Sequence, residues 1–198
     1  MTAPRTASVE RTTAETSITL RVDIDGTGST SVETGLPFFD HMLAQLGRPG
    51  GLDLTVEAKG DLEIDAHHTV EDVGIALGGA LKEALGDKAG VRRFASVAVP
   101  LDEALVEAAL DLSGRPFLVY AIEPPGEKIL GDPPFDPQLV EEFWRAFVTS
   151  AAITLHITSV RGVNTHHLIE ATFKAVARSL RDAVSVEGGG VPSTKGVL

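Results

Sequence analysis

The chain has 198 residues, of which 43% are hydrophobic, a composition that suits one globular domain with a buried core. It contains no cysteine, which excludes disulfides, thiolate nucleophiles and thiolate metal ligands. A formal net charge of −11 argues against nucleic acid and anionic membranes as partners. The first ten residues are polar and no apolar run is long enough to span a bilayer, which predicts a cytoplasmic protein.

Strand and helix patterns follow roughly the same order in the two halves of the chain. In the first half we expect a strand, a short helix, a strand and a long helix, at residues 18–25, 38–46, 52–58 and 65–85. In the second half we expect two strands, a short helix, a strand and a long helix, at residues 105–112, 117–122, 139–148, 153–158 and 164–184. The prolines within 123–137 exclude a helix or a central strand, so this segment is predicted to be an inserted loop.

The two long helices match position by position. Asp65 and Asn164 are separated by 99 residues, half the chain length, and the histidines and glutamates that follow them keep the same spacing. Both residues stand where a helix N-cap belongs, which places the histidines in the first helical turn. We therefore predict an internally duplicated α+β domain, with pseudo-repeats at about 8–90 and 91–190 and a C-terminal tail. Each repeat is expected to hold a small antiparallel sheet backed by helices.

Each long helix begins with the pattern His-His-x-x-Glu. The two copies consist of His67, His68 and Glu71, and of His166, His167 and Glu170. Residues three and four apart share a helix face, so each glutamate lies near both of its histidines. Adjacent histidines diverge by about 100° around the helix axis, which suits ligation of two different ions. Imidazole and carboxylate together favour Mn or Zn over Mg or Ca, and we predict two Mn ions, with Zn or Fe less favoured.

The bland alternative is that histidines at a helix start are caps or solvated residues. Four of the six histidines fall in the two matching pairs, which makes chance placement a poor explanation. His41 opens the first short helix and is the natural further imidazole ligand, although a lone histidine is usually structural. His156 lies on the polar face of an alternating strand and stays outside the predicted ligand set.

With these residues in view, the sequence resembles the imidazoleglycerol-phosphate dehydratase family over nearly its whole length. The matching segments are FDHML at 39–43, DAHHTVED at 65–72, DLSGRP at 111–116, HHLIEATFK at 166–174 and PSTKG at 192–196. The resemblance implies a duplicated α+β fold, two Mn ions per site at subunit contacts and a homo-oligomer of 24 subunits. It also implies the dehydration of imidazole glycerol phosphate to imidazole acetol phosphate in histidine biosynthesis.

That reaction explains why metals are needed. The substrate is a diol without a carbonyl group, so its imidazole ring must accept the electrons, and metals on both ring nitrogens would stabilise the imidazolate. By resemblance, Glu15 is the acid/base that moves the protons. Lys174 lies four residues after Glu170 on the same helix face and is expected to assist substrate binding or proton transfer.

Phosphate capture requires cations in this acidic chain. The candidates that the resemblance implies are Arg93, Arg115 and Lys195, with hydroxyls from Ser193 and Thr194 and an amide from Gln45. Without the resemblance, the tail that contains three of these residues would be interpreted as a frayed terminus.

One position departs from the family pattern. The family's usual second-half counterpart of His41 is another histidine, but this chain has Glu142 there. His41 lies 26 residues before His67, and the spacing from Glu142 to His166 is 24 residues. We hypothesise that Glu142 ligates the second metal through oxygen and shifts that site toward Mn. The alternative is an exposed helix glutamate, with His156 or a water molecule completing the coordination.

Two other functions use the same ligands. A dinuclear hydrolase acting on phosphate esters or amides would activate water with them, although the absence of HExxH disfavours the zincin class. A metal carrier or storage protein would bind metal reversibly and would need neither Glu15 nor the basic residues.

Overall fold

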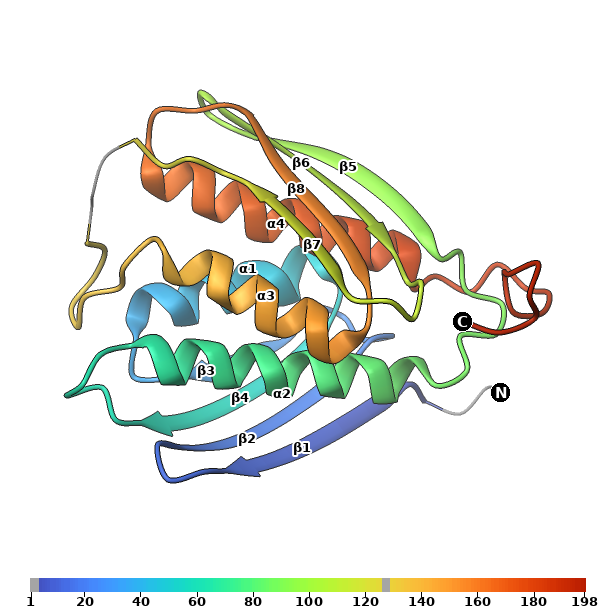
Figure 1. The fold of residues 1–198 in the computed structure, drawn as a ribbon, viewed down its shortest axis with the longest axis horizontal. Helices are drawn as coiled ribbons and strands as arrows, with labels where there is room; N and C mark the ends of the chain where they lie inside the picture. The colour runs from blue at the N-terminus through green and yellow to red at the C-terminus, as the bar shows by residue number, and fades with distance from the viewer. Residues whose placement is uncertain (1–3, 126–128) are drawn as a thin grey trace.

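Two sheets form the outer layers of the molecule, and helices fill the space between them (Figure 1). The computed structural model describes residues 4–125 and 129–198. The first half contains β1 (Thr6–Thr12), β2 (Thr16–Asp23), β3 (Thr30–Glu33), α1 (Pro37–Gly50), β4 (Asp53–Gly60) and α2 (His67–Leu85). The second half contains β5 (Phe94–Leu101), β6 (Ala104–Asp111), β7 (Phe117–Ala121), α3 (Leu139–Ala151), β8 (Thr154–Arg161) and α4 (Thr165–Ala183). The order of elements is the same in both halves, which confirms the predicted duplication and the α+β class.

The two sheets share one topology. Their strand orders are β1-β2-β4-β3 and β5-β6-β8-β7. The expectation of purely antiparallel sheets is wrong, because β3 pairs with β4, and β7 with β8, in parallel. A helix connects the two strands of each parallel pair and returns the chain to the same end of the sheet, which a tight hairpin cannot do.

All nine predicted strands and helices are present, with ends that differ by a few residues. The strands β1, β3 and β5 were not predicted. In β1, Ala7 is the one fully buried residue, so the alternation that marks a half-buried strand is weak. The segment 129–137 has no helix or long strand, in agreement with the predicted insertion, and residues 126–128 lie outside the described chain.

The starts of α2 and α4 place the histidine pairs. The side chain of Asn164 accepts hydrogen bonds from the backbone N–H groups of His166 and His167, at 2.9 and 3.3 Å, as an N-cap does. In α2 the N-cap position belongs to Ala66, one residue later than predicted. The carboxylate of Asp65, the residue before the N-cap, still accepts a hydrogen bond from the backbone N–H of His67 at 2.7 Å, so it fixes the first turn of α2.

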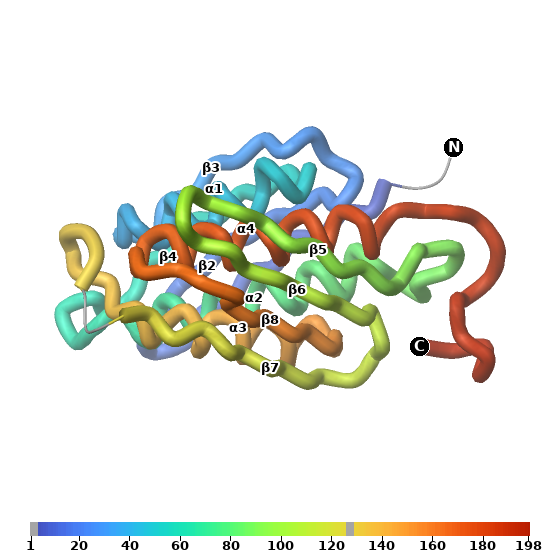
Figure 2. The backbone as a smooth tube through the Cα atoms, turned by 90° about the horizontal axis from the view of Figure 1, so that it is seen from above, coloured from blue at the N-terminus to red at the C-terminus, as the bar shows by residue number. Residues whose placement is uncertain are grey.

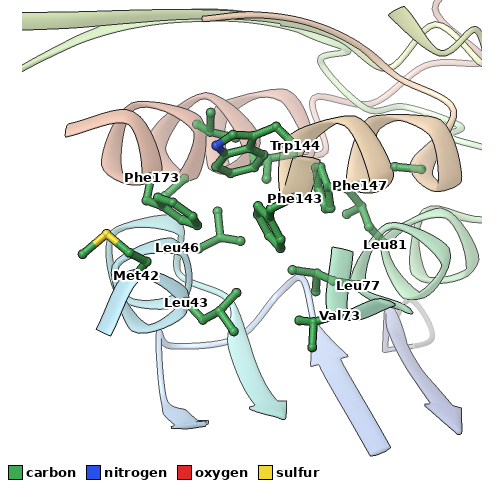
Figure 3. Close-up of a cluster of buried hydrophobic side chains, with 14 of the residues drawn as sticks. Met42, Leu43, Leu46, Val73, Leu77, Leu81, Phe143, Trp144, Phe147 and Phe173 are labelled. Atoms are coloured by element: carbon green, nitrogen blue, oxygen red, sulfur yellow. The ribbon is translucent and has the colours of Figure 1, made fainter. Parts of the chain in front are cut away.

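The core lies where the helices of one half meet those of the other. Helix α1 packs against α4, and α2 packs against α3. Aromatic side chains of α3 and α4 meet aliphatic side chains of α1 and α2 in this layer (Figure 3). The labelled members are Met42, Leu43, Leu46, Val73, Leu77, Leu81, Phe143, Trp144, Phe147 and Phe173.

Two glycines allow α2 and α3 to approach closely. A Cβ at Gly74 would lie 2.8 Å from the carbonyl oxygen of Phe143, and one at Gly78 would lie 2.4 Å from that of Phe147. Side chains at these positions would force the helices apart. Because each helix pair joins the two halves, side chains of both halves come together at the helix ends.

No helix among the described residues is long and apolar enough to cross a membrane.

Candidate metal and substrate site

His41, His166 and Glu170 form a compact group at the contact between α1 and α4. Their potential ligand atoms all lie within 4.8 Å of one another. The Nε2 atoms of His41 and His166 lie 3.2 and 2.9 Å from the same oxygen of Glu170. Two imidazole nitrogens and one carboxylate oxygen are a donor set that suits Mn, Zn or Fe. The residues therefore fit a divalent transition metal, and the exposed imidazoles leave room for further ligands.

Glu170 is ionised in this group. Burial raises the pKa of its carboxyl, but hydrogen bonds from Lys174, His166 and His41 outweigh that effect and lower the pKa to about 2. Lys174 Nζ lies 2.5 Å from Oε1, while Oε2 faces the two histidines. Lys174 thus orients the Glu170 carboxylate so that its other oxygen faces the imidazoles, and it keeps the carboxylate negatively charged. This structural role is additional to the predicted role of Lys174 in substrate binding or proton transfer.

The equivalent group of the other helix pair is looser. His67 Nε2 lies 3.9 Å from Glu71 Oε2. Glu142, at the start of α3, lines the same cavity of about 500 Å³ as His67. Its carboxylate lies 4.0 Å from the guanidinium of Arg145, and its side chain is 40% exposed. Among the described residues these ligands do not converge as His41, His166 and Glu170 do.

His68 and His167 are the remaining members of the two histidine pairs. Adjacent rings are nearly perpendicular, at 84° for His67 and His68 and at 86° for His166 and His167. A carboxylate of Asp61 lies 3.0 Å from His68 Nδ1, and this hydrogen bond raises the pKa of His68. Such a carboxylate fixes the ring orientation and leaves Nε2 as the free ligand atom, which is the usual environment of metal-binding histidines.

Glu103 holds the ring of His167 at Nδ1, as Asp61 holds the ring of His68. Its carboxylate lies 2.8 Å from Nδ1 of His167. The hydrogen bond from this ring, together with the backbone N–H of Val163, lowers the pKa of Glu103 to about 2. Neither Asp61 nor Glu103 was predicted from the sequence. The strands of the two halves repeat at a spacing of 88 residues, since Ala104–Asp111 follows Thr16–Asp23 by that number. Glu103 follows Glu15 by the same 88 residues, so this spacing could have identified Glu103 from the sequence.

Glu15 lies in the turn between β1 and β2. Its carboxylate lies 3.7 Å from Nε2 of His68, and its side chain is 53% exposed. The structure therefore places Glu15 beside one predicted ligand and leaves its carboxylate open to an incoming molecule.

The predicted phosphate-binding residues gather at the opposite end of the molecule. A cavity of about 820 Å³ is lined by Arg93, Arg115, Ser193, Thr194 and Lys195. Arg93 is already engaged, because its guanidinium lies 2.7 Å from the carboxylate of Asp111 and donates to the carbonyl of Pro192. It therefore holds the tail in place, while Arg115 and Lys195 are exposed and, within the described residues, pair with no acid. Gln45 does not join this cavity; it lies on α1, one turn after His41.

One chain does not bring this cavity close to its own candidate metal ligands. The backbone N–H of Arg93 donates to the carbonyl of Ala183, at the last residue of α4, whereas His166 lies in the first turn of that helix. A helix of 19 residues spans about 28 Å. Figure 2 shows the C-terminal tail beyond one end of α4, and the segment before α3 at the other end of the molecule.

Comparisons with known proteins identify the family. A sequence profile of imidazoleglycerol-phosphate dehydratase matches residues 34–180. The chain is 56% identical over 196 residues to the imidazoleglycerol-phosphate dehydratase of Frankia casuarinae, with 98% of this chain and 99% of the relative covered. The chain belongs to the imidazoleglycerol-phosphate dehydratase family. It is therefore an enzyme, a hydro-lyase, and the resemblance seen in the sequence is confirmed.

Solved structures of the family carry the same fold. The crystal structure of the imidazoleglycerol-phosphate dehydratase of Staphylococcus aureus has a TM-score of 0.82 and 39% identity, and the match covers 91% of this chain and 99% of that one. The enzyme of Pyrococcus furiosus, solved in complex with (S)-C348, has a TM-score of 0.81 and 33% identity, with 96% and 100% covered. Both support the duplicated α+β fold.

Proposed function

We propose that the chain dehydrates imidazole glycerol phosphate to imidazole acetol phosphate in histidine biosynthesis, at a site with two Mn ions. Family membership supports the dehydration, and the convergence of His41, His166 and Glu170 is the observation that carries the metal site. When bound, the metals supply Lewis acidity that stabilises negative charge on the imidazole ring of the substrate.

The metal ligands fall into two sets related by the duplication. One set is His41, His166 and Glu170, and the other is Glu142, His67 and Glu71. His68 and His167 complete the coordination from outside these sets. Since Asp61 and Glu103 hold their Nδ1 atoms, their Nε2 atoms are free to bind a metal.

Glu15 moves the protons. In the forward direction its carboxylate accepts the proton from the carbon that carries the retained hydroxyl, after the hydroxyl next to the ring has left. Glu15 then returns this proton to the carbon beside the ring while the enol loses its O–H proton, which gives the ketone. The hydroxyl leaves as water with the proton that the ring nitrogen gives up, and the O–H proton of the enol restores that ring proton. A carboxylate that is exposed and held by one long contact can receive and return a proton without breaking a strong ion pair.

Arg115, Ser193, Thr194 and Lys195 hold the phosphate in this proposal, and the C-terminal tail serves as a substrate-binding segment. The distance along α4 between this cavity and the metal ligands requires that one copy of the chain binds the phosphate while another binds the imidazole. This supports a homo-oligomer, for which the family resemblance implies 24 subunits. The outer face of the second sheet carries exposed Phe94 and Phe117, 55% and 60% exposed, which suits burial against another copy.

One assay separates this proposal from its rivals. The protein is loaded with Mn and incubated with imidazole glycerol phosphate, and the products are identified by mass spectrometry. Imidazole acetol phosphate supports the proposed reaction. Release of inorganic phosphate would instead indicate a hydrolase, and an unchanged substrate in the presence of fully bound metal would indicate a carrier.

Glu142 provides a test of the second ligand set. Glu142→His should retain both metals and activity, because imidazole can replace the carboxylate as a ligand. Glu142→Ala should lose one metal or bind it weakly. Metal content per chain is measured by elemental analysis, together with the dehydration rate. Full occupancy and full rate in the alanine variant would show that Glu142 is not a ligand, and Glu141→Ala, one residue earlier on α3, is the matched control.

The phosphate cavity is tested separately. Arg115→Ala and Lys195→Ala are expected to raise KM for the substrate by about 10-fold or more, since each removes a charge-assisted contact to phosphate. Bound metal should stay at the wild-type level. Steady-state kinetics and elemental analysis check this result, and loss of metal with an unchanged KM would contradict the assignment.

A further inference from the structure

A buried carboxylate connects α2 to the hairpin of β1 and β2. Asp72 is 7% exposed and follows Glu71 in the chain. One of its oxygens accepts from Nε and Nη2 of Arg11, at 3.0 and 2.7 Å. The other accepts from the hydroxyl of Thr16 at 2.5 Å. The carboxylate is thus satisfied on both oxygens, by one residue from each strand of the hairpin.

The same hairpin carries Glu15 in its turn. The hydroxyl oxygen of Thr13 accepts from the backbone N–H groups of Glu15 and Thr16, at 3.1 and 3.0 Å. The backbone N–H of Thr13 donates to the carbonyl of Thr16 at 2.9 Å. Asp72 holds Thr16, and Thr16 closes the turn from which the Glu15 side chain projects. The position of the Glu15 carboxylate relative to α2 therefore depends on this network.

The second half of the molecule shows that the fold does not need this network. At the repeat spacings, Thr16 corresponds to Ala104 and Asp72 to Ala171, and both alanines are almost fully buried. Arg11 corresponds to Val99, which packs against the core. The hairpin of β5 and β6 packs on α4 as that of β1 and β2 packs on α2. Apolar contacts are thus sufficient for this packing, whereas a buried ion pair carries a desolvation cost.

The turn residues of the two halves also differ in how they are held. Glu103, the counterpart of Glu15, is fixed directly by His167 and by backbone N–H groups of Val163 and Asn164. Among the described residues, Glu15 has one ion-pair contact, at 3.7 Å to His68. A carboxylate that must remain free for a proton cannot be positioned by its own strong hydrogen bonds. It has to be positioned through the backbone that carries it.

We propose that Asp72, with Arg11 and Thr16, is a positioning residue that aims the Glu15 carboxylate at the substrate. The inference rests on the proposed role of Glu15 as the proton-transferring group. Loosening of the turn lowers the rate of proton transfer but leaves the metal ligands and the phosphate cavity in place. A displacement of a catalytic group by about 1 Å can cost about 100-fold in rate.

The test compares kcat, KM and metal content in the Mn-loaded enzyme. Asp72→Asn and Thr16→Val are expected to lower kcat by about 10- to 100-fold, with KM and metal content unchanged. Thr16→Ser keeps the hydroxyl and should keep most of the rate. Asp25→Asn is the matched control, because it breaks the ion pair with Arg5 at the other end of the same hairpin. It should leave kcat unchanged.

A double variant separates positioning from a purely structural role. If Asp72 acts through Glu15, Glu15→Gln with Asp72→Asn has the same kcat as Glu15→Gln alone. Multiplicative losses, loss of metal in Asp72→Asn, or an equal loss in Asp25→Asn would overturn the inference. Thr16→Val gives the same comparison if Asp72→Asn does not fold.

Amide hydrogen exchange tests the inference independently of activity. Exchange at residues 13–16 should accelerate in Asp72→Asn and in Thr16→Val, but not in Asp25→Asn. Unchanged exchange would overturn the inference even if the enzyme is active. An inactive wild type, or a fully active Glu15→Gln variant, would instead refute the proposed function.

Discussion

Glu15→Gln is expected to lower kcat by about 10²- to 10⁴-fold, the usual contribution of a positioned general acid/base. The amide keeps the size and hydrogen-bonding shape of the side chain but cannot accept a proton. KM and metal content should stay close to the wild-type values, because Glu15 contacts one proposed ligand, His68, at 3.7 Å and belongs to neither proposed ligand set. Steady-state kinetics with Mn-loaded protein measures the effect.

Glu103→Gln is the variant to compare with Glu15→Gln. Glu103 occupies the equivalent turn of the second half, but its carboxylate holds His167. Its main effect should be on metal affinity, with a loss of about 10- to 100-fold that excess metal reverses. A Glu15→Gln variant that excess Mn rescues, or one with an unchanged kcat, would rule out the assigned role of Glu15.

Removal of the metals by a chelator is expected to abolish dehydration, and added Mn to restore it. Ligands that bind only the assembled enzyme stabilise the assembly, so sedimentation should also shift toward smaller species without metal. Glu170→Gln should reproduce much of this loss, because it removes a carboxylate that faces both His41 and His166. Elemental analysis should find two ions per chain in the active enzyme.

A second glutamate serves as the control for Glu170. Glu83 is exposed near the C-terminal end of α2, and Glu83→Gln should keep metal, assembly and rate. Active protein with fewer than two ions per chain would contradict the two-metal proposal. Sedimentation that is indifferent to the chelator would contradict the link between metal and assembly.

Hydrophobic periodicity was enough to predict the four helices and the four central strands, because their buried faces repeat at regular intervals. It was not enough for edge strands such as β1, where Ala7 is the one fully buried residue. The parallel pairing within each sheet was also missed, since the pattern of a strand does not state the direction of its neighbour. Direction follows from the helix that connects the two strands.

The candidate ligands could be found as a set from the sequence, but not divided into groups. His41 and Glu170 are 129 residues apart and meet because α1 of one half packs on α4 of the other. No local pattern encodes this contact. Asp61 was missed for a related reason, because its partner His68 lies seven residues away, on the other side of the connection between β4 and α2. The pairing of Arg93 with Asp111 was missed as well, because it depends on the register of β5 and β6.

The exchange of helix partners between the halves has a consequence for how this enzyme arose. A single repeat could not complete the compact ligand group by itself, because its short helix needs the long helix of a second repeat. An ancestral half-length protein would therefore have been a symmetric dimer with two identical ion sites. Fusion of two such copies into one chain would release the two sites from that identity. Glu142 at the counterpart of His41, and the alanines at the counterparts of Thr16 and Asp72, are differences that a symmetric dimer of identical chains cannot carry.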